Sequence, residues 1–217
     1  MTSALPTAVI DVWGAAPTHD GTLLVLPDGC RDLIRCQAPG QRPEWWVSHL
    51  FDAAEPFPHC SGLRMAGYRL HPAASIDLDG LLRAVGARQD ADTGDVLDLI
   101  ESHVRVDDRL AEALAGLAGA PSVARAARQL GVSERTLERH TVAGTTRTPG
   151  FWKSLARVRR AAVALGGGHA LAEAAVDHGY ADQAHMTREF RRWFTLPPHR
   201  FRVQAELVAQ VVTPGYR

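Results

Sequence analysis

Hydrophobic and polar positions alternate over short stretches in residues 1–72 and follow a helical period in most of the remaining chain. The early stretches are rich in β-branched, aromatic and aliphatic residues, and proline- and glycine-containing turn signals separate them. Several short strands at this spacing predict a small barrel or jelly-roll-like sheet. The predicted strands are Val9–Trp13, Thr22–Leu26, Asp32–Cys36, Trp45–Leu50 and Arg64–Leu70.

Turn residues suggest how these strands are connected. The run Pro27-Asp28-Gly29 lies between Leu23–Leu26 and Asp32–Ile34, and it predicts a β-hairpin there. Pro56 and Pro58 are interpreted as further turn signals. These turn signals fit the small barrel or jelly-roll-like sheet that the strand spacing predicts.

Helical periodicity begins after residue 73. Leu78, Leu81, Leu82 and Val85 have helix spacing within residues 73–90, and a polar hinge follows at residues 90–94. Further helices are predicted at Asp95–His103, Asp107–Leu117 and Pro149–Leu165, the last ended by Gly166-Gly167-Gly168.

Two stretches of the C-terminal half have the pattern of a helix-turn-helix motif. Each contains a short apolar-faced helix, a glycine break, an N-cap residue and a second helix rich in long polar side chains. The first runs from Ser122 to Arg139 and the second from Leu171 to Arg192. Two such units on one chain point to sequence-specific binding of double-stranded DNA.

The residue types suit this chemistry. Gly131 and Gly179 permit the sharp turn, and Ser133 and Asp182 can cap the second helix of each motif. Arginine pairs bidentately with guanine, and glutamate accepts from cytosine. The candidate DNA-binding residues are Ser133, Glu134, Arg135, Thr136, Glu138, Arg139, Gln183, His185, Thr187, Arg188, Arg191 and Arg192, of which Arg191 and Arg192 are expected to contact phosphate.

Charge is divided unevenly along the chain, although the formal net charge is zero. Residues 1–120 carry 9 Lys+Arg against 17 Asp+Glu, a net −8. Residues 121–217 carry 15 Lys+Arg against 7 Asp+Glu, a net +8. A basic half attracts the phosphate backbone, so we expect the C-terminal half to bind DNA and the acidic half to have another role.

The motif residues resemble the AraC/XylS family of bacterial transcription regulators over about residues 95–205. The likeness is carried by Gly179-Tyr180, Asp182, Gln183-Ala184-His185, Thr187-Arg188 and Pro198 with Phe201-Arg202. Arg157 stands where the family places an arginine on the helix between its motifs. The resemblance implies seven helices in two subdomains that enter successive major grooves.

The sequence departs from the family pattern at three positions. Thr141 stands where the family usually has an aromatic residue, which makes a core position polar. Thr146 and Thr195 stand where the family usually has glycine. The fragment from Leu26 to Ile34 resembles the short cupin-like sensor domains found in one branch of the family, and it implies an effector or dimerisation domain.

Candidate chemistry in the N-terminal half is less specific. Aromatic residues are common in ligand pockets, so a tentative effector site comprises Trp13, Cys30, Trp45, Trp46 and Tyr68, although the aromatic side chains could equally form the sheet core. A thiol- or metal-responsive regulator that uses Cys30, Cys36 and Cys60 is an alternative. Their spacing is not that of a zinc module, and no metal or other cofactor is expected.

An enzyme is not expected. Residues 1–120 contain no His-x-His pair, and the chain has no nucleophile-elbow, P-loop or dinucleotide motif. A cupin-type metalloenzyme fused to a DNA-binding module is the less favoured alternative. No apolar run is long enough for a membrane helix and no secretory signal is evident, so a cytoplasmic protein with no membrane partner is expected.

The sequence therefore predicts an α+β protein, with a small β-barrel or cupin-like domain before an all-α domain. The expected division is a sensor or dimerisation domain at residues 1–90, a helical connector at 91–120, the double helix-turn-helix domain at 121–205 and a C-terminal tail at 206–217. The expected function is a sequence-specific transcription regulator, with a small-molecule effector and a homodimer as further partners.

Overall fold

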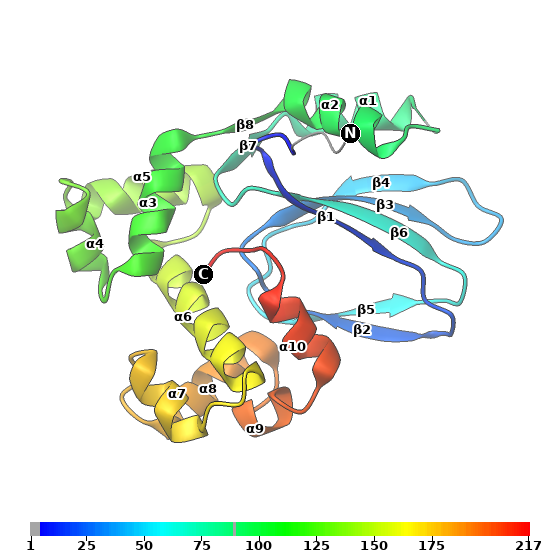
Figure 1. The fold of residues 1–217 in the computed structure, drawn as a ribbon. Helices are drawn as coiled ribbons and strands as arrows, with labels where there is room; N and C mark the ends of the chain where they lie inside the picture. The colour runs from blue at the N-terminus through cyan, green and yellow to red at the C-terminus, as the bar shows by residue number, and fades with distance from the viewer. Residues whose placement is uncertain (1–4, 89) are drawn as a thin grey trace. The chain divides into compact units, whose positions relative to one another are not determined.

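The computed structural model describes residues 5–88 and 90–217 and divides into two compact units (Figure 1). The sheet unit comprises the residues up to Leu23 together with Cys30–Leu50 and Pro56–Asp107. The helical unit comprises Asp108–Arg217 and two short inserted segments, Leu24–Gly29 and Phe51–Glu55. The predicted α+β class, with antiparallel sheets before a helical region, is confirmed.

The sheet unit is built around a four-stranded antiparallel sheet with strand order β1-β6-β3-β4. The remaining strands of the described chain form two separate pairs, β2-β5 and β7-β8, and no closed barrel results. The strands are β1 (Val9–Ala15), β2 (Gly21–Val25), β3 (Arg31–Gln37), β4 (Glu44–Val47), β5 (Glu55–His59), β6 (Arg64–Leu70), β7 (Ala74–Ile76) and β8 (Val104–Val106).

The predicted hairpin around Pro27-Asp28-Gly29 is wrong. Strand β2 pairs with β5, whereas β3 lies between β6 and β4. The segment that joins them belongs to the helical unit, whose contacts determine its path. Pro56 and Pro58 were expected in turns, but they lie in β5, which has a single partner strand. Prolines two residues apart place their missing N–H groups on the same edge, so an edge strand tolerates them.

The core of the sheet unit lies on one face of the four-stranded sheet. Leu33 is paired in register with Tyr68 and Val47, and cross-strand partners point to the same face. These residues pack against Leu81 and Ile100 of two helices, α1 (Leu78–Gly86) and α2 (Thr93–His103). Figure 1 shows both helices on this side and the β2-β5 pair on the other.

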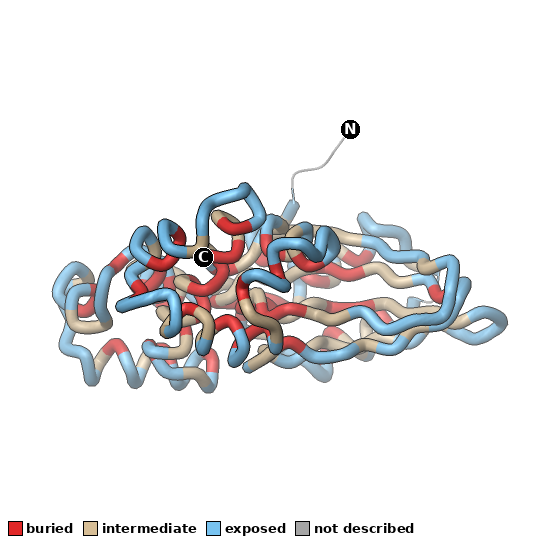
Figure 2. Tube along the Cα trace, turned by 90° about the horizontal axis from the view of Figure 1, so that it is seen from below, coloured by how far each residue is buried: buried red, intermediate tan, exposed pale blue. Residues whose placement is uncertain are grey.

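The helical unit follows the predicted periodicity closely. Its helices are α3 (Asp108–Gly119), α4 (Val123–Gln129), α5 (Glu134–Thr145), α6 (Pro149–Gly166), α7 (Leu171–Asp177), α8 (Gln183–Phe194), α9 (Pro198–Phe201) and α10 (Ala205–Val212). Helix α10 lies where only a tail was expected, and its buried side chains are Leu207 and Val211. The buried positions of each unit are red in Figure 2.

The predicted domain boundaries at residues 90, 120 and 205 remain predictions. The expected connector at 91–120 contains α2, β8 and α3, and the division between the two units falls after Asp107. Within the described residues, no helix is long and apolar enough to cross a membrane.

Candidate nucleic-acid interface

The first helix-turn-helix motif consists of α4 and α5. Ala126 and Ala127 are buried on α4, where their small side chains allow the next helix to approach closely. Gly131 makes the turn with φ of +67°, a conformation that favours glycine. The Ser133 Oγ then accepts a hydrogen bond from the Thr136 amide at 3.1 Å and caps α5.

The outer face of α5 carries exposed charged side chains in its N-terminal half. Leu137 is buried, which fixes the rotation of the helix. The hydroxyls of Ser133 and Thr136 lie 2.9 Å apart and are engaged with each other. The exposed charged side chains are Glu134, Arg135, Glu138 and Arg139.

The second motif, formed by α7 and α8, repeats this geometry. Gly179 has φ of +71° and makes the turn, and the buried Tyr180 fills the gap between the helices. The Asp182 carboxylate accepts a hydrogen bond from the His185 amide at 2.6 Å and caps α8. Burial of Met186 and Phe190 sets the rotation of α8.

Some of the predicted site residues of α8 make contacts within the protein, and others are exposed to solvent. The half-buried His185 ring packs edge-on against Tyr180 with centroids 5.3 Å apart, and the Thr187 hydroxyl donates to the Gln183 carbonyl. The exposed Arg192 lies near Glu189 and over the Trp193 ring. The other predicted site residues of α8, Gln183, Arg188 and Arg191, are exposed.

A polar network joins the second motif to the bridging helix α6. The Arg157 guanidinium lies 4.7 Å from the Tyr180 ring centroid and 3.5 Å from Glu189. The Ser154 hydroxyl donates to Glu189 at 2.5 Å and accepts from the Trp193 indole at 3.2 Å. Burial raises the pKa of Tyr180, which keeps this phenol neutral. The sequence did not indicate a role for Glu189, because no neighbouring residues mark it as the centre of a polar network.

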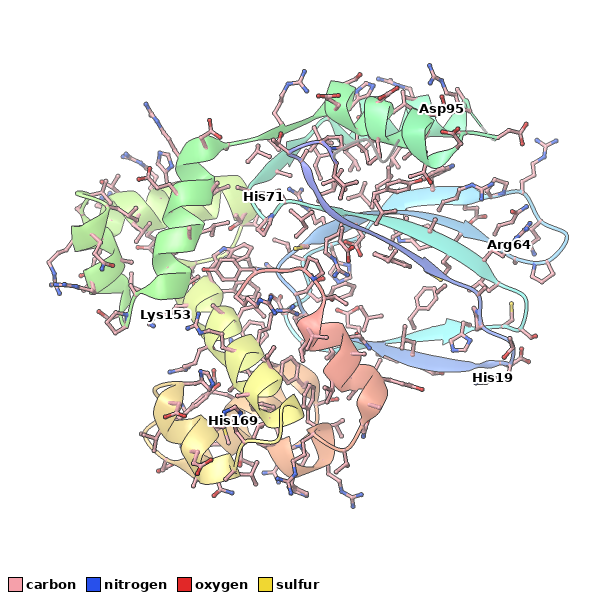
Figure 3. The ribbon with its side chains drawn as sticks, in the orientation of Figure 1. His19, Arg64, His71, Asp95, Lys153 and His169 are labelled. Atoms are coloured by element: carbon pink, nitrogen blue, oxygen red, sulfur yellow. The ribbon has the colours of Figure 1, made fainter. Side chains whose placement is uncertain are left out.

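Helix α6 is also joined to α3 and α5. The ammonium of Lys153, labelled in Figure 3, donates to the Ala120 carbonyl at 2.8 Å, and burial lowers its pKa. Arg160 donates to the Ala118 carbonyl at 2.8 Å, so both α6 side chains cap the end of α3. The Trp152 indole donates to the Thr145 hydroxyl at the end of α5.

Thr141, the polar residue at an expected core position, is fully buried on α5. Its hydroxyl donates to the Leu137 carbonyl one turn earlier, so the helix itself satisfies this polar group.

The inserted segment Leu24–Gly29 is held within the helical unit by α6, α10 and the C-terminal residues. Gln210 of α10 accepts from the Leu26 amide and donates to the Leu24 carbonyl, at 3.1 and 2.9 Å. The fully buried Arg159 donates to the Pro27 carbonyl at 3.2 Å. The Tyr216 amide donates to the Asp28 carbonyl at 2.8 Å. No pattern in the sequence indicated these long-range contacts.

A helix-turn-helix domain family model matches residues 126–204. This part of the chain is an AraC-type helix-turn-helix domain. The resemblance predicted from the two motifs is therefore confirmed for this domain, and the AraC-type domain contains both α5 and α8. No curated protein matches the chain.

Several solved structures are similar to this chain. One is a transcriptional regulator with an AraC-type DNA-binding domain from Chromobacterium violaceum, 25% identical, with a TM-score of 0.40; the match covers 50% of this chain and 96% of the other. Another is ToxT from Vibrio cholerae O395, 8% identical, with a TM-score of 0.48; the match covers 89% of this chain and 97% of the other.

Outside the AraC-type domain, the five tentative effector residues do not come together as one cluster. Trp45 and Tyr68 stack with centroids 6.5 Å apart and pack against the core beneath α1 and α2. Trp13 is in register with Gly67 and Trp46 with Ile34, and Ile34 and Gly67 are themselves cross-strand partners. Both tryptophans therefore lie on the sheet face opposite to Trp45 and Tyr68. Cys30 is buried just before β3.

A charged cluster also occupies this opposite face. The Asp32 carboxylate accepts from the Trp13 indole at 2.9 Å and from Arg69 at 3.3 Å, and Arg69 also lies 3.9 Å from Asp11. The Trp13 ring crosses Gly67, where an added Cβ would lie 2.1 Å from the ring. Two carboxylates around one guanidinium give this cluster a formal charge of −1.

The cysteines of the described chain are free thiols, buried at Cys30, half-buried at Cys36 and exposed at Cys60. Burial raises the pKa of Cys36, which disfavours its thiolate at neutral pH. Within residues 5–88 and 90–217, no group of three or more His, Cys, Asp or Glu side chains is arranged to hold a metal ion.

Proposed function

We propose that the chain is a cytoplasmic, sequence-specific transcription regulator that reads double-stranded DNA with α5 and α8. Its sheet unit binds a small-molecule effector or mediates self-association. The AraC-type domain supports DNA binding, and the net +8 of residues 121–217 supports attraction to phosphate. Ligand binding would alter DNA binding if the ligand has different affinities for two states of the protein.

This proposal rests mainly on the observation that α5 and α8 lie in one compact unit and expose their polar faces to solvent in the same way. Each helix follows a glycine turn, has a side-chain N-cap and buries one apolar face. Each therefore presents its opposite face, with long polar side chains, to solvent. An α-helix of this kind fits the major groove, and two of them can read two blocks about one helical turn, ~34 Å, apart.

Different predicted residues support different roles. Arg135 is exposed in the first turn of α5 and Arg188 is exposed in the middle of α8, and both positions suit contacts to base edges. Arg191 and Arg192 lie in the last turn of α8, which suits contacts to phosphate. Ser133 and Thr187 form hydrogen bonds within their own helices. They would affect DNA binding mainly by holding the backbone of the helix in place.

For the effector, the sheet face that carries Trp13 and Trp46 is the better supported location. Trp45 and Tyr68 already fill the core on the other face. The Asp11–Arg69–Asp32 cluster beside Trp13 adds a polar group that could orient a ligand.

Alanine variants test the DNA-reading roles on the duplex that the full-length protein selects from a random pool. Arg135→Ala and Arg188→Ala should each weaken binding to that duplex by ~1–3 kcal/mol and leave binding to scrambled DNA nearly unchanged. Equal losses on both duplexes would contradict base readout and reassign the arginines to phosphate.

A further inference from the structure

The inserted segment Phe51–Glu55 contacts the region where α5 and α8, the proposed recognition helices, end. The Ala54 amide donates to the carbonyl of Trp193, in the last turn of α8, at 2.7 Å. The Ala54 side chain is buried, with 7% of its surface exposed. The Asp52 carboxylate lies 2.9 Å from the Arg147 Nε, two residues beyond the end of α5. Five residues from the N-terminal third of the chain thus reach both motifs.

Aromatic contacts continue this connection on α6. The Arg147 guanidinium lies 5.5 Å from the Phe151 ring centroid. Phe151 packs edge-on against Trp193 at 5.2 Å and against Trp152 at 5.5 Å. The ends of α5 and α8 are therefore linked by one continuous set of contacts through Phe151, and residues 51–55 lie against both ends of that set.

We propose that residues 51–55 are a brace that fixes the position of α5 relative to α8, so that Asp52 and Ala54 are positioning residues for two-groove DNA binding. This inference rests on the proposed function. The segment contacts the C-terminal end of α8 and the residue two positions beyond the end of α5, so it acts through helix position and not through contact with bases.

The brace has a physical consequence for DNA binding. When the first recognition helix is bound, the second binds with an effective concentration that depends on how well its position matches the next groove. A rigid spacing favours DNA blocks at one separation and disfavours blocks shifted by a base pair. A loosened brace lowers affinity for the matched duplex and weakens discrimination against shifted ones.

A measurement without DNA tests the brace directly. Keto-bearing unnatural amino acids can replace the exposed Ala143 of α5 and Ala184 of α8 and carry one spin label each. This labelling leaves the native cysteines unchanged. Ala54→Pro removes the N–H that donates to Trp193. The label-to-label distance distribution should broaden in Ala54→Pro and stay narrow in Ala54→Ser, which keeps the N–H.

Asp52→Ala serves as the second variant. Its side chain is 66% exposed, so its loss should not unfold the chain, and the same broadening should appear to a smaller degree. Asp79→Ala, an equal change of charge on the exposed surface of α1, should leave the distribution unchanged. An unaltered width in both Ala54→Pro and Asp52→Ala would overturn the brace, whether or not the wild-type chain binds DNA specifically.

The DNA readout compares the selected two-block duplex with versions carrying one base pair more or less between the blocks. Ala54→Pro should lower affinity for the matched duplex about tenfold and bring the three affinities closer together. Affinity for a duplex with a single block should not change. Loss of single-block binding, or unchanged spacing discrimination, would contradict a positioning role.

Discussion

At the scale of single residues, the ends of α5 and α8 show where this chain departs from the pattern of the family that its motifs resemble. Thr146 and Thr195 follow α5 and α8 and both have φ of +61°. They are the two positive-φ residues other than glycine in the described chain. The resemblance to a family with glycine at these positions made this conformation predictable, since glycine is favoured there because it lacks a Cβ.

Replacing either threonine with glycine should stabilise the protein. A left-handed conformation costs a residue with a Cβ roughly 1–2 kcal/mol, and the lost Thr hydroxyl bond to the preceding carbonyl offsets part of that gain. We expect Thr146→Gly and Thr195→Gly each to raise the free energy of unfolding by about 1 kcal/mol in urea titrations. Thr148→Ala, which removes the cap of α6, should lower it; lower stability in the glycine variants would refute the argument.

The Asp77 carboxylate should make stability depend on acid pH. Hydrogen bonds from the His103 ring and then from the Gly80 amide hold the pKa of Asp77 below its ordinary value of 3.8. Because the folded pKa is lowered, the contribution is present above pH 3.8 and is lost as the pH falls through the folded pKa. The Tm difference between wild type and Asp77→Asn should therefore be present above pH 3.8 and vanish as the pH falls through the folded pKa. A Tm difference that grows as the pH falls would contradict a stabilising role of the ionised Asp77 carboxylate.

At the scale of elements, local periodicity and capping predicted the helices well, whereas strand pairing was not predictable. Ser133 and Asp182 lie within three residues of the amides that they cap, so this information is local. The partners of Leu24–Gly29 are about 130 to 190 residues away. No short-range pattern encodes such contacts, which is why a hairpin was predicted there.

Gly29 gives a test of how firmly this segment is held. It has φ of +77°, and an added Cβ would lie 2.7 Å from the Tyr216 Cβ and 2.9 Å from the Trp152 ring. Gly29→Ala therefore adds steric overlap to an unfavourable φ and should cost at least ~2 kcal/mol in unfolding followed by tryptophan fluorescence.

The matched control is Gly131→Ala. Gly131 has a similar φ of +67°, but an added Cβ would meet nothing within 4 Å. This variant should cost about 1 kcal/mol. Equal costs for the two variants would show that the segment is free to move away from α6.

At the scale of the whole molecule, charge divides the sequence into two halves but does not locate the boundary between the two compact units. The acidic first 120 residues and the basic remainder were evident from the sequence. The insertion of Leu24–Gly29 and Phe51–Glu55 into the helical unit was not, because it depends on tertiary packing. The candidate DNA-contact residues were identifiable from motif spacing, whereas Glu189, Arg159 and Ala54 are recognised only by their contacts.

The proposed phosphate contact of Arg191 predicts a change in salt dependence. Each phosphate contact contributes about 0.9 to the slope of log K against log salt. Arg191→Ala should reduce the magnitude of the slope by about 1 and weaken binding to all sequences equally. Arg64→Ala, which removes a positive charge from the sheet unit (Figure 3), should leave the slope unchanged. An unchanged slope in Arg191→Ala would argue against phosphate contact.

Selection of duplexes from a random DNA pool by the full-length protein is the decisive test of DNA reading by α5 and α8. It should be performed at two salt concentrations, about 50 and 200 mM, because non-specific binding falls steeply with salt. We expect an enriched site with two short blocks one helical turn apart, retained at the higher salt. Salt-sensitive binding that enriches no sequence would contradict a regulator that reads DNA through both α5 and α8.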